Sequence, residues 1–132
     1  MKAHVAALAE ESWREADTAL ARAYAEAERA HRALAVLTRK PPQPKPLLDA
    51  HQALVLALEE LAHGLRLRGL VPFGKVGSVE VFDPLRHGLE TGSAENGATV
   101  RFLAPGVAGP QRGIVLKALV RRVRSRKHQG GK

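Results

Sequence analysis

The chain has 132 residues, no cysteine, and 21 Lys or Arg against 13 Asp or Glu, which gives a net charge of +8 at pH 7. Without cysteine it forms neither disulfides nor thiolate metal sites, and its length suits one domain or a helical segment plus a small domain. Five residues are aromatic, so an elongated or oligomeric protein is expected rather than one with a thick core.

No apolar run approaches the roughly 20 residues that span a bilayer. The first residues include Glu10 and Glu11, which do not fit the apolar core of a secretory signal peptide. These features predict a protein without membrane spans, located in the cytoplasm.

Residues 3–38 contain neither Gly nor Pro and are rich in Ala, Glu and Arg, which favour helix. Apolar residues occupy every a and d position of one heptad register, and this pattern predicts a coiled-coil stalk over residues 1–40. The alternative is a single solvent-facing helix that packs lightly on another element. The a positions are Ala6, Trp13, Leu20, Ala27 and Leu34, and the d positions are Ala9, Ala16, Ala23, Ala30 and Leu37.

Residues 41–46, PPQPKP, predict an extended spacer, because proline lacks an amide donor and restricts the residue before it. Residues 47–68 predict a second helix with a wide leucine stripe, which needs cover on more than one side. We therefore expect a helical-bundle segment that forms a homodimer. The expected dimer contacts are Trp13, Leu20, Leu34, Leu54, Leu58, Leu61 and Leu65.

Residues 69–123 predict a small β domain, since Gly, Pro and β-branched residues become frequent there. Residues 98–104 form one expected strand. Residues 113–123 form another, with Ile114, Leu116, Ala118 and Val120 on one face, although a helix over the same residues remains possible. Asp83-Pro84 predicts the start of a short helical turn over 84–89. The expected class is α+β, with N-terminal helices followed by strands.

The junction between the two parts resembles that of GrpE-type nucleotide exchange factors, the co-chaperones of DnaK-type heat-shock chaperones. That family has a Gly-Val-x-Pro-Ile-like stretch, another Gly, then Phe-Asp-Pro-x-x-His, and later two glycines nine residues apart. The corresponding residues here are Gly69, Val71, Pro72, Gly77, Phe82, Asp83, Pro84, His87, Gly97 and Gly106. The likeness covers residues 47–120, whereas 3–38 match only as generic helix.

The resemblance implies a protein that docks on the nucleotide-binding domain of a DnaK-type chaperone and promotes the release of ADP, without an enzymatic activity or cofactor of its own. It also implies docking residues on the β domain and the junction. The candidates are Val71, Pro72, Arg101, Leu103 and Lys117.

The sequence contains no phosphate-binding loop, no paired histidines with metal-ligand spacing and no nucleophile-elbow motif. His87 follows Asp83 by four residues, so the two side chains could pair on one helical turn. We expect a capping and docking arrangement there rather than a catalytic dyad. No metal or cofactor site is predicted.

Residues 121–132 hold six Lys or Arg and no acidic residue, and 124–132 predict a disordered basic tail. The alternative function is therefore a coiled-coil protein that associates with nucleic acid through this tail, since phosphate contacts need only basic side chains. The tail has no aromatic residue for base stacking. A solvated tail, or a GrpE-derived scaffold that no longer serves a chaperone, are the other interpretations.

Overall fold

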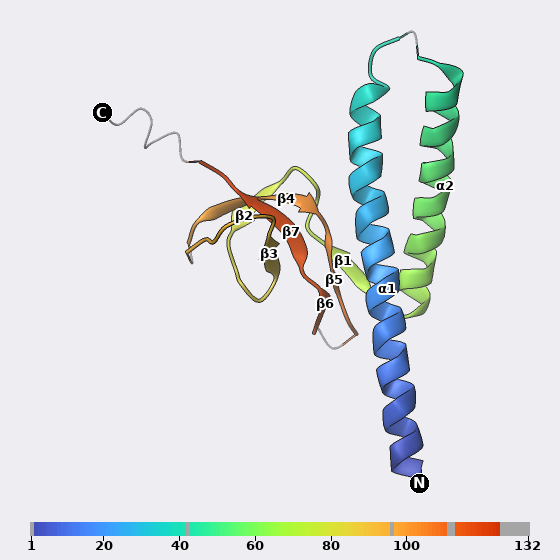
Figure 1. The fold of residues 1–132 in the computed structure, drawn as a ribbon, viewed down its shortest axis with the longest axis vertical. Coiled ribbons are helices and arrows are strands. Elements are labelled where there is room, and N and C mark those ends of the chain that lie inside the picture. Colours follow the sequence, from blue (N-terminus) through green and yellow to red (C-terminus); the bar gives the residue numbers. More distant parts are fainter. Residues whose placement is uncertain (1, 42, 96, 111–112, 125–132) are drawn as a thin grey trace.

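The computed structural model describes residues 2–41, 43–95, 97–110 and 113–124. Two helices are followed in these residues by seven short strands in two sheets, so the α+β class and its order along the chain are confirmed. Figure 1 shows that α2 and the sheets lie on opposite sides of α1. None of the described helices combines the length and apolar character needed to cross a membrane.

The helices are α1, Lys2–Leu37, and α2, Lys45–Leu67, which run side by side as a hairpin (Figure 1). Helix α2 starts two residues before the predicted start at 47, so the predicted spacer 41–46 is too long. The prolines explain the difference. Pro44 is the extended N-cap and Pro46 lies in the first turn, where a missing amide donor costs nothing because those amides have no partner within the helix.

The two helices contact each other through a narrow face of each. His31 of α1 stacks on His51 of α2 with ring centroids 5.1 Å apart, and Leu20 lies against the backbone of Gly64. The half-buried leucines 54, 58 and 61 repeat on the α2 face that carries His51 and the buried Leu65. Helix α1 therefore covers the leucine stripe that the sequence analysis assigned to a dimer contact.

Two polar contacts hold the C-terminal end of α2 on α1. The Arg68 guanidinium donates to both carboxylate oxygens of Asp17, at 2.8 and 3.2 Å. It also lies 4.1 Å from the centroid of the Trp13 ring, within the range of a cation–π interaction. Trp13 stays 55% exposed, so it lies at the edge of the hairpin.

Gly69 ends α2, as the sequence predicted. Its φ is +70°, a conformation that glycine adopts without strain. The Gly69 amide donates to Arg66 O at 3.0 Å and the Leu70 amide donates to Leu65 O at 2.8 Å. This is the Schellman arrangement, and its usual apolar contact is present because Leu65 and Leu70 pack in one buried cluster.

The first sheet contains β1, Val71–Phe73, β5, Gly106–Ala108, and β6, Ile114–Leu116, in the order β1-β5-β6. The second has the order β2-β4-β7-β3. Its strands are β2, Val79–Val81, β3, His87–Leu89, β4, Thr99–Ala104, and β7, Ala118–Arg122.

A long bent hairpin links the two sheets. One arm is β4 followed by β5, the other is β6 followed by β7, and the arms pair antiparallel along both sheets. The bends fall at Pro105 and Lys117, between the strands. The prediction of strand rather than helix over 113–123 is therefore confirmed, but the prediction that Ile114, Leu116, Ala118 and Val120 share one face of one strand is wrong: the first two lie in the first sheet and the last two in the second.

A second prediction is also wrong. The helical turn expected over 84–89 is limited to a turn at 84–86, and residues 87–89 form β3, which pairs in parallel with β7. Pairing with β7 satisfies the backbone groups that a longer helix would have used internally.

Two buried clusters form the core. One joins the helices to the first sheet through Ala21, Leu65, Leu70 and Val107. The other lies under the second sheet and consists of Val100, Phe102, Ala118 and Val120, with Phe73, Phe82 and Leu89 packed around it. The β strands from 71 to 122, here called the β unit, thus meet the helices through the first cluster and keep the second to themselves.

Candidate docking surface

A shallow groove of about 610 Å³ lies where the β unit leaves the helices. It runs between β1, the end of β5, the start of β6 and the turn at 83–86. Three apolar side chains in it are exposed: Val71 at 59%, Leu85 at 75% and Ile114 at 37%. The groove is lined by Gly69, Val71, Phe73, Asp83, Leu85, Arg86, Ala108, Gly109, Pro110 and Ile114.

Leu85 reaches the groove because Asp83 shapes the turn that carries it. The Asp83 carboxylate accepts the Leu85 amide at 3.0 Å, while the Asp83 carbonyl accepts the amides of Arg86 and His87 at 3.0 and 2.9 Å. Asp caps a turn in this way because its side chain reaches the backbone two residues on. The capping role predicted for Asp83 is confirmed, although the turn is shorter than expected.

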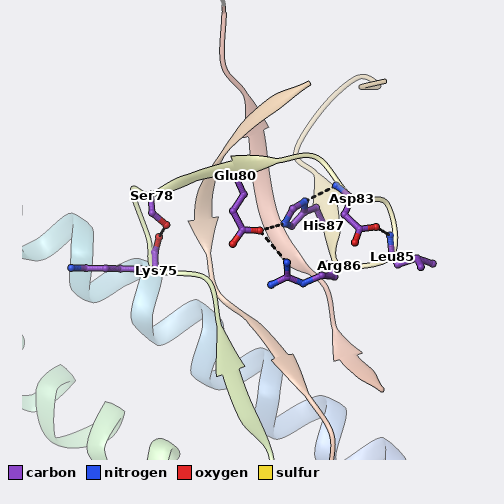
Figure 2. A network of polar contacts seen from close by, with 7 residues as sticks. All are labelled: Lys75, Ser78, Glu80, Asp83, Leu85, Arg86 and His87. Atoms are coloured by element: carbon purple, nitrogen blue, oxygen red, sulfur yellow. Dashed lines mark hydrogen bonds and ion pairs between the residues drawn. The ribbon is translucent and has the colours of Figure 1, made fainter. Parts of the chain in front are cut away.

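The buried His87 side chain holds this turn through hydrogen bonds. It is 2% exposed, its Nδ1 accepts the Asp83 backbone amide at 3.0 Å, and its Nε2 lies 3.2 Å from Glu80 Oε1. Since Nδ1 accepts a hydrogen bond, the ring proton is on Nε2 and is donated to Glu80. Figure 2 shows Glu80, Arg86 and His87 converging beside the turn.

The imidazole also packs in the core. Its ring is 5.3 Å from that of Phe102 in an edge-to-face arrangement and 6.0 Å from that of Phe82. Both ring nitrogens are occupied by hydrogen bonds. His87 therefore holds the turn and has no free nitrogen with which to take a proton from a substrate.

The spacing of Asp83 and His87 in the sequence also suggested a pair between the Asp83 carboxylate and the His87 ring. The structure gives a different arrangement, because His87 binds the Asp83 backbone amide and the carboxylate partner of the ring is Glu80. The local reason is that Asp83 already uses its carboxylate to cap Leu85. The capping interpretation fits this geometry better than a catalytic dyad.

Charged groups border the groove on the side of the turn. Arg86 donates to Glu80 Oε1 at 3.2 Å and its guanidinium lies 4.8 Å from the Phe73 ring centroid. Phe73 in turn packs on Gly106, where an added Cβ would overlap the ring and lie 2.7 Å from the Ala118 amide nitrogen. Glycine at 106 therefore allows the first sheet to approach the second closely.

The five predicted docking residues do not form one surface. Val71 lines the groove, whereas Pro72 points to the other face of β1, since side chains alternate along a strand. Pro72 borders a hollow against α1 with Tyr24 and Glu28. Burial there, together with the Glu28 carboxylate whose Oε2 accepts the Tyr24 hydroxyl at 3.4 Å, raises the pKa of Tyr24 above its usual 10.0.

The other three lie elsewhere. Arg101 is exposed on the face of β4 that is opposite the buried Val100 and Phe102. Leu103 is half-buried and has no partner in β7, because the register shifts between Phe102 and Ala104. Lys117 is exposed at the bend between β6 and β7, beside Arg22 and Gly88. Only Val71 of the five belongs to the groove.

The residues that carry the family resemblance have mainly structural positions. Gly69 ends α2, the half-buried Phe82 packs on the second cluster, and Gly106 brings the sheets together. Pro84 follows Asp83 in the turn. Gly77 and Gly97 lie in turns beside β2 and β4, both with positive φ. Val107, which follows Gly106, is fully buried.

Leu85 and Ile114 are groove residues that the sequence analysis did not select. The signal for Leu85 was present, because an apolar residue directly after an Asp-Pro turn start projects outward from the turn. Ile114 gave no such signal. It was assigned to one face of a strand together with Leu116, Ala118 and Val120, and the bend at Lys117 separates it from the last two of these.

No group of three or more His, Cys, Asp or Glu side chains within the described ranges is arranged to hold a metal ion. The predicted basic tail, 124–132, lies outside the described residues except for Arg124. The chain matches no protein-family model, and no curated protein or solved structure is significantly similar to it.

Proposed function

We propose that this protein is a GrpE-like nucleotide exchange factor, whose β unit docks on the nucleotide-binding domain of a DnaK-type chaperone and favours the open nucleotide cleft. The observation that supports the proposal most is the exposed apolar groove at the junction of the helices and the β unit. Six of its ten lining residues come from 69–73 and 83–86, the segments that carry the resemblance to GrpE-type factors.

The groove has the properties of a small docking surface. Exposed apolar side chains that cluster in a concave region, bordered by charges, are typical of protein interaction sites. Val71, Leu85 and Ile114 supply the apolar contact, and Asp83 and Arg86 supply the polar border. The hydrogen bonds of His87 and Asp83 fix the turn in advance, which lowers the entropy lost on docking.

The proposed mechanism is a coupling between two binding equilibria. The factor accelerates ADP release only if it binds the open form of the chaperone more tightly than the closed form. Linkage then requires that ADP weaken binding of the factor by the same ratio as the factor weakens binding of ADP. No chemical step by this chain is needed, and a location in the cytoplasm stays a prediction.

The proposal includes a homodimer formed along α1. The five d positions of the predicted heptads are all exposed, so neither α2 nor the sheets cover this strip of α1. Alanines at these positions allow close approach of a second helix. The strip consists of Ala9, Ala16, Ala23, Ala30 and Leu37.

The exchange reaction is tested by stopped-flow release of a fluorescent ADP analogue from a DnaK-type chaperone, with and without saturating protein. We expect acceleration by the unaltered chain and a loss of at least tenfold in apparent affinity for V71S/L85S, since two apolar contacts of about 1 kcal/mol each are lost. The matched control is V81S, which changes an equally exposed valine at the end of β2.

An unaltered rate of ADP release at saturating protein would refute the exchange function. Equal losses for V71S/L85S and V81S would instead refute the assignment of the groove. The dimer is tested separately by sedimentation equilibrium, where A16E/A23E should shift the particle to monomer while the helix signal in circular dichroism is retained. A monomeric unaltered chain at micromolar concentration would refute the dimer.

A further inference from the structure

Four arginines from two distant parts of the chain lie where α1 faces the second sheet, two of them on one carboxylate and two on one turn. Arg29 and Arg32 come from α1, Arg101 from β4 and Arg121 from β7. Glu90 lies between α1 and β7: its Oε1 accepts Arg121 at 2.9 Å and its Oε2 is 3.7 Å from Arg29. The four guanidiniums and the one carboxylate give this arginine cluster a net charge of +3.

Arg32 and Arg101 are held in place without being neutralised. Arg32 Nη2 donates to Val76 O and Arg101 Nη1 donates to Gly77 O, each at 2.9 Å. These are consecutive carbonyls, so the two arginines lie beside the same turn. Among the described residues, no carboxylate lies within 4.0 Å of either guanidinium. Each keeps donors free, because a guanidinium has five N–H groups.

The cluster also contains an unfavourable contact. Arg101 and Arg121 are directly opposite each other in the antiparallel pair β4–β7, and like charges in that position destabilise a sheet. Glu90 offsets the repulsion for Arg121 only. Glu26 and Arg22 lie one turn apart on α1, beside Gly88 and Leu89, and their opposite charges sum to zero.

We propose that the arginine cluster binds the phosphate backbone of a nucleic acid, independently of the exchange activity. Guanidinium forks fit phosphate oxygens, and backbone binding needs positive charge rather than a shaped apolar pocket. The centre of the cluster is the Glu90 ion pair instead of the apolar centre that a protein interface has. None of the five aromatic side chains belongs to it, so binding does not depend on base stacking.

The surrounding charge fits the same ligand. The described chain leaves the cluster through Arg122 and Arg124, both exposed, and the sequence after 124 adds three basic residues and no acidic one. These residues add positive charge at the end of β7 and in the chain beyond it. In contrast to the tail interpretation, this site requires arginines from α1 and β4.

The test is fluorescence anisotropy with a labelled single-stranded DNA of mixed sequence and the full chain, between about 50 and 200 mM NaCl. We expect R32Q/R101Q to weaken binding about tenfold at the lower salt and to reduce the slope of log K against log salt by about 1.4, since each phosphate contact with a single strand contributes about 0.7. The control R14Q/R66Q removes two equally exposed charges from the helices, away from the cluster, and should change binding less than about twofold.

Two further variants separate binding from folding. E90Q removes the one carboxylate of the cluster, and we expect it to bind DNA severalfold more tightly, a gain that a damaged fold does not produce. R32K/R101K keeps the charge and should retain most of the affinity. Equal losses for R32Q/R101Q and R14Q/R66Q, or weaker binding by E90Q, would overturn the site.

The chemical class of the ligand is tested by competition with poly-glutamate of matched total charge. DNA should displace the labelled strand at a lower concentration than poly-glutamate. Equal or better competition by poly-glutamate would overturn the nucleic-acid assignment in favour of an acidic protein segment. Absence of salt-dependent binding by the unaltered chain would overturn the proposal as a whole.

Discussion

The helical hairpin and the β unit bury their side chains in different ways. On α1 the buried residues in the described part are Ala21 and Ala25, and most hairpin leucines are half-exposed. The β unit buries Phe102, Val100 and Val120 almost completely, together with the hydrogen-bonded His87. Because apolar burial per residue is larger in the β unit, we expect it to be the more stable part.

This difference has a functional consequence. The groove proposed for docking rests on the tightly packed region, while the strip proposed for dimerisation lies on the thin hairpin. A rigid support favours a site that must keep its shape, whereas an alanine-rich helix gains most of its burial from a partner. Four measurements test whether the two regions differ in this way.

The largest effect is expected for Phe102→Ala, which removes the largest side chain of the second cluster. The loss in the free energy of unfolding should be about 3–5 kcal/mol, from lost burial and the cavity left behind. Leu20→Ala in the hairpin should cost about 1–2 kcal/mol, because Leu20 is only half-buried. Urea unfolding followed by circular dichroism measures both, and equal costs would contradict the comparison.

A smaller loss, about 2–3 kcal/mol, is expected for His87→Ala. The change leaves the Asp83 amide without its acceptor and opens a space beside Phe102. The control is His63→Ala on the exposed side of α2, where the change should stay within about 0.5 kcal/mol. Amide exchange at Leu85 should also accelerate in the first variant, and unaltered exchange there would argue against the anchoring role.

His51→Leu should stabilise the hairpin by about 1 kcal/mol. The His51 Nε2 is buried and has no hydrogen-bond partner among the described residues, and a buried polar atom without a partner is costly. Leucine is of similar size and continues the apolar stripe of α2. Thermal unfolding measures the gain, with His63→Leu as the exposed control. A lower melting temperature for His51→Leu would show that its stacking on His31 outweighs the unpaired nitrogen.

The smallest effect concerns alkaline pH. Burial first, and then the Glu28 carboxylate, raise the pKa of Tyr24 above 10.0. The folded state therefore favours the protonated phenol, and this contribution to stability is complete below pH 10 and is lost as pH rises through the higher folded pKa. Tyr24 is the one tyrosine of the chain, so phenolate absorbance reports it alone.

The titration midpoint should lie above 10 in the folded protein and return toward 10 in concentrated urea. Glu28→Gln should lower the folded midpoint, while Glu26→Gln, two residues away on the same helix, should leave it unchanged. A folded midpoint at or below 10 would contradict the burial of Tyr24 and its contact with Glu28.

Helix ends and turns that are fixed by residues close together in the chain were predictable from the sequence. The glycine at the end of α2 and the aspartate that caps the turn at 83 act through backbone groups one to five residues away. The long helix α1 follows from the absence of Gly and Pro over its length. Of the candidate site, the sequence pointed to Val71 and the Asp83 turn but missed Leu85 and Ile114.

The ends of the helices and the capped turn at Asp83 follow from local sequence, because propensities and caps act over a few residues. Three features are set by the fold instead: α1 packs on the leucines of α2, residues 113–123 divide between two sheets, and Arg32 and Arg101 share one turn. Each of these depends on contacts between residues far apart in the chain. Their pairing is set by packing of whole elements, which no local pattern records.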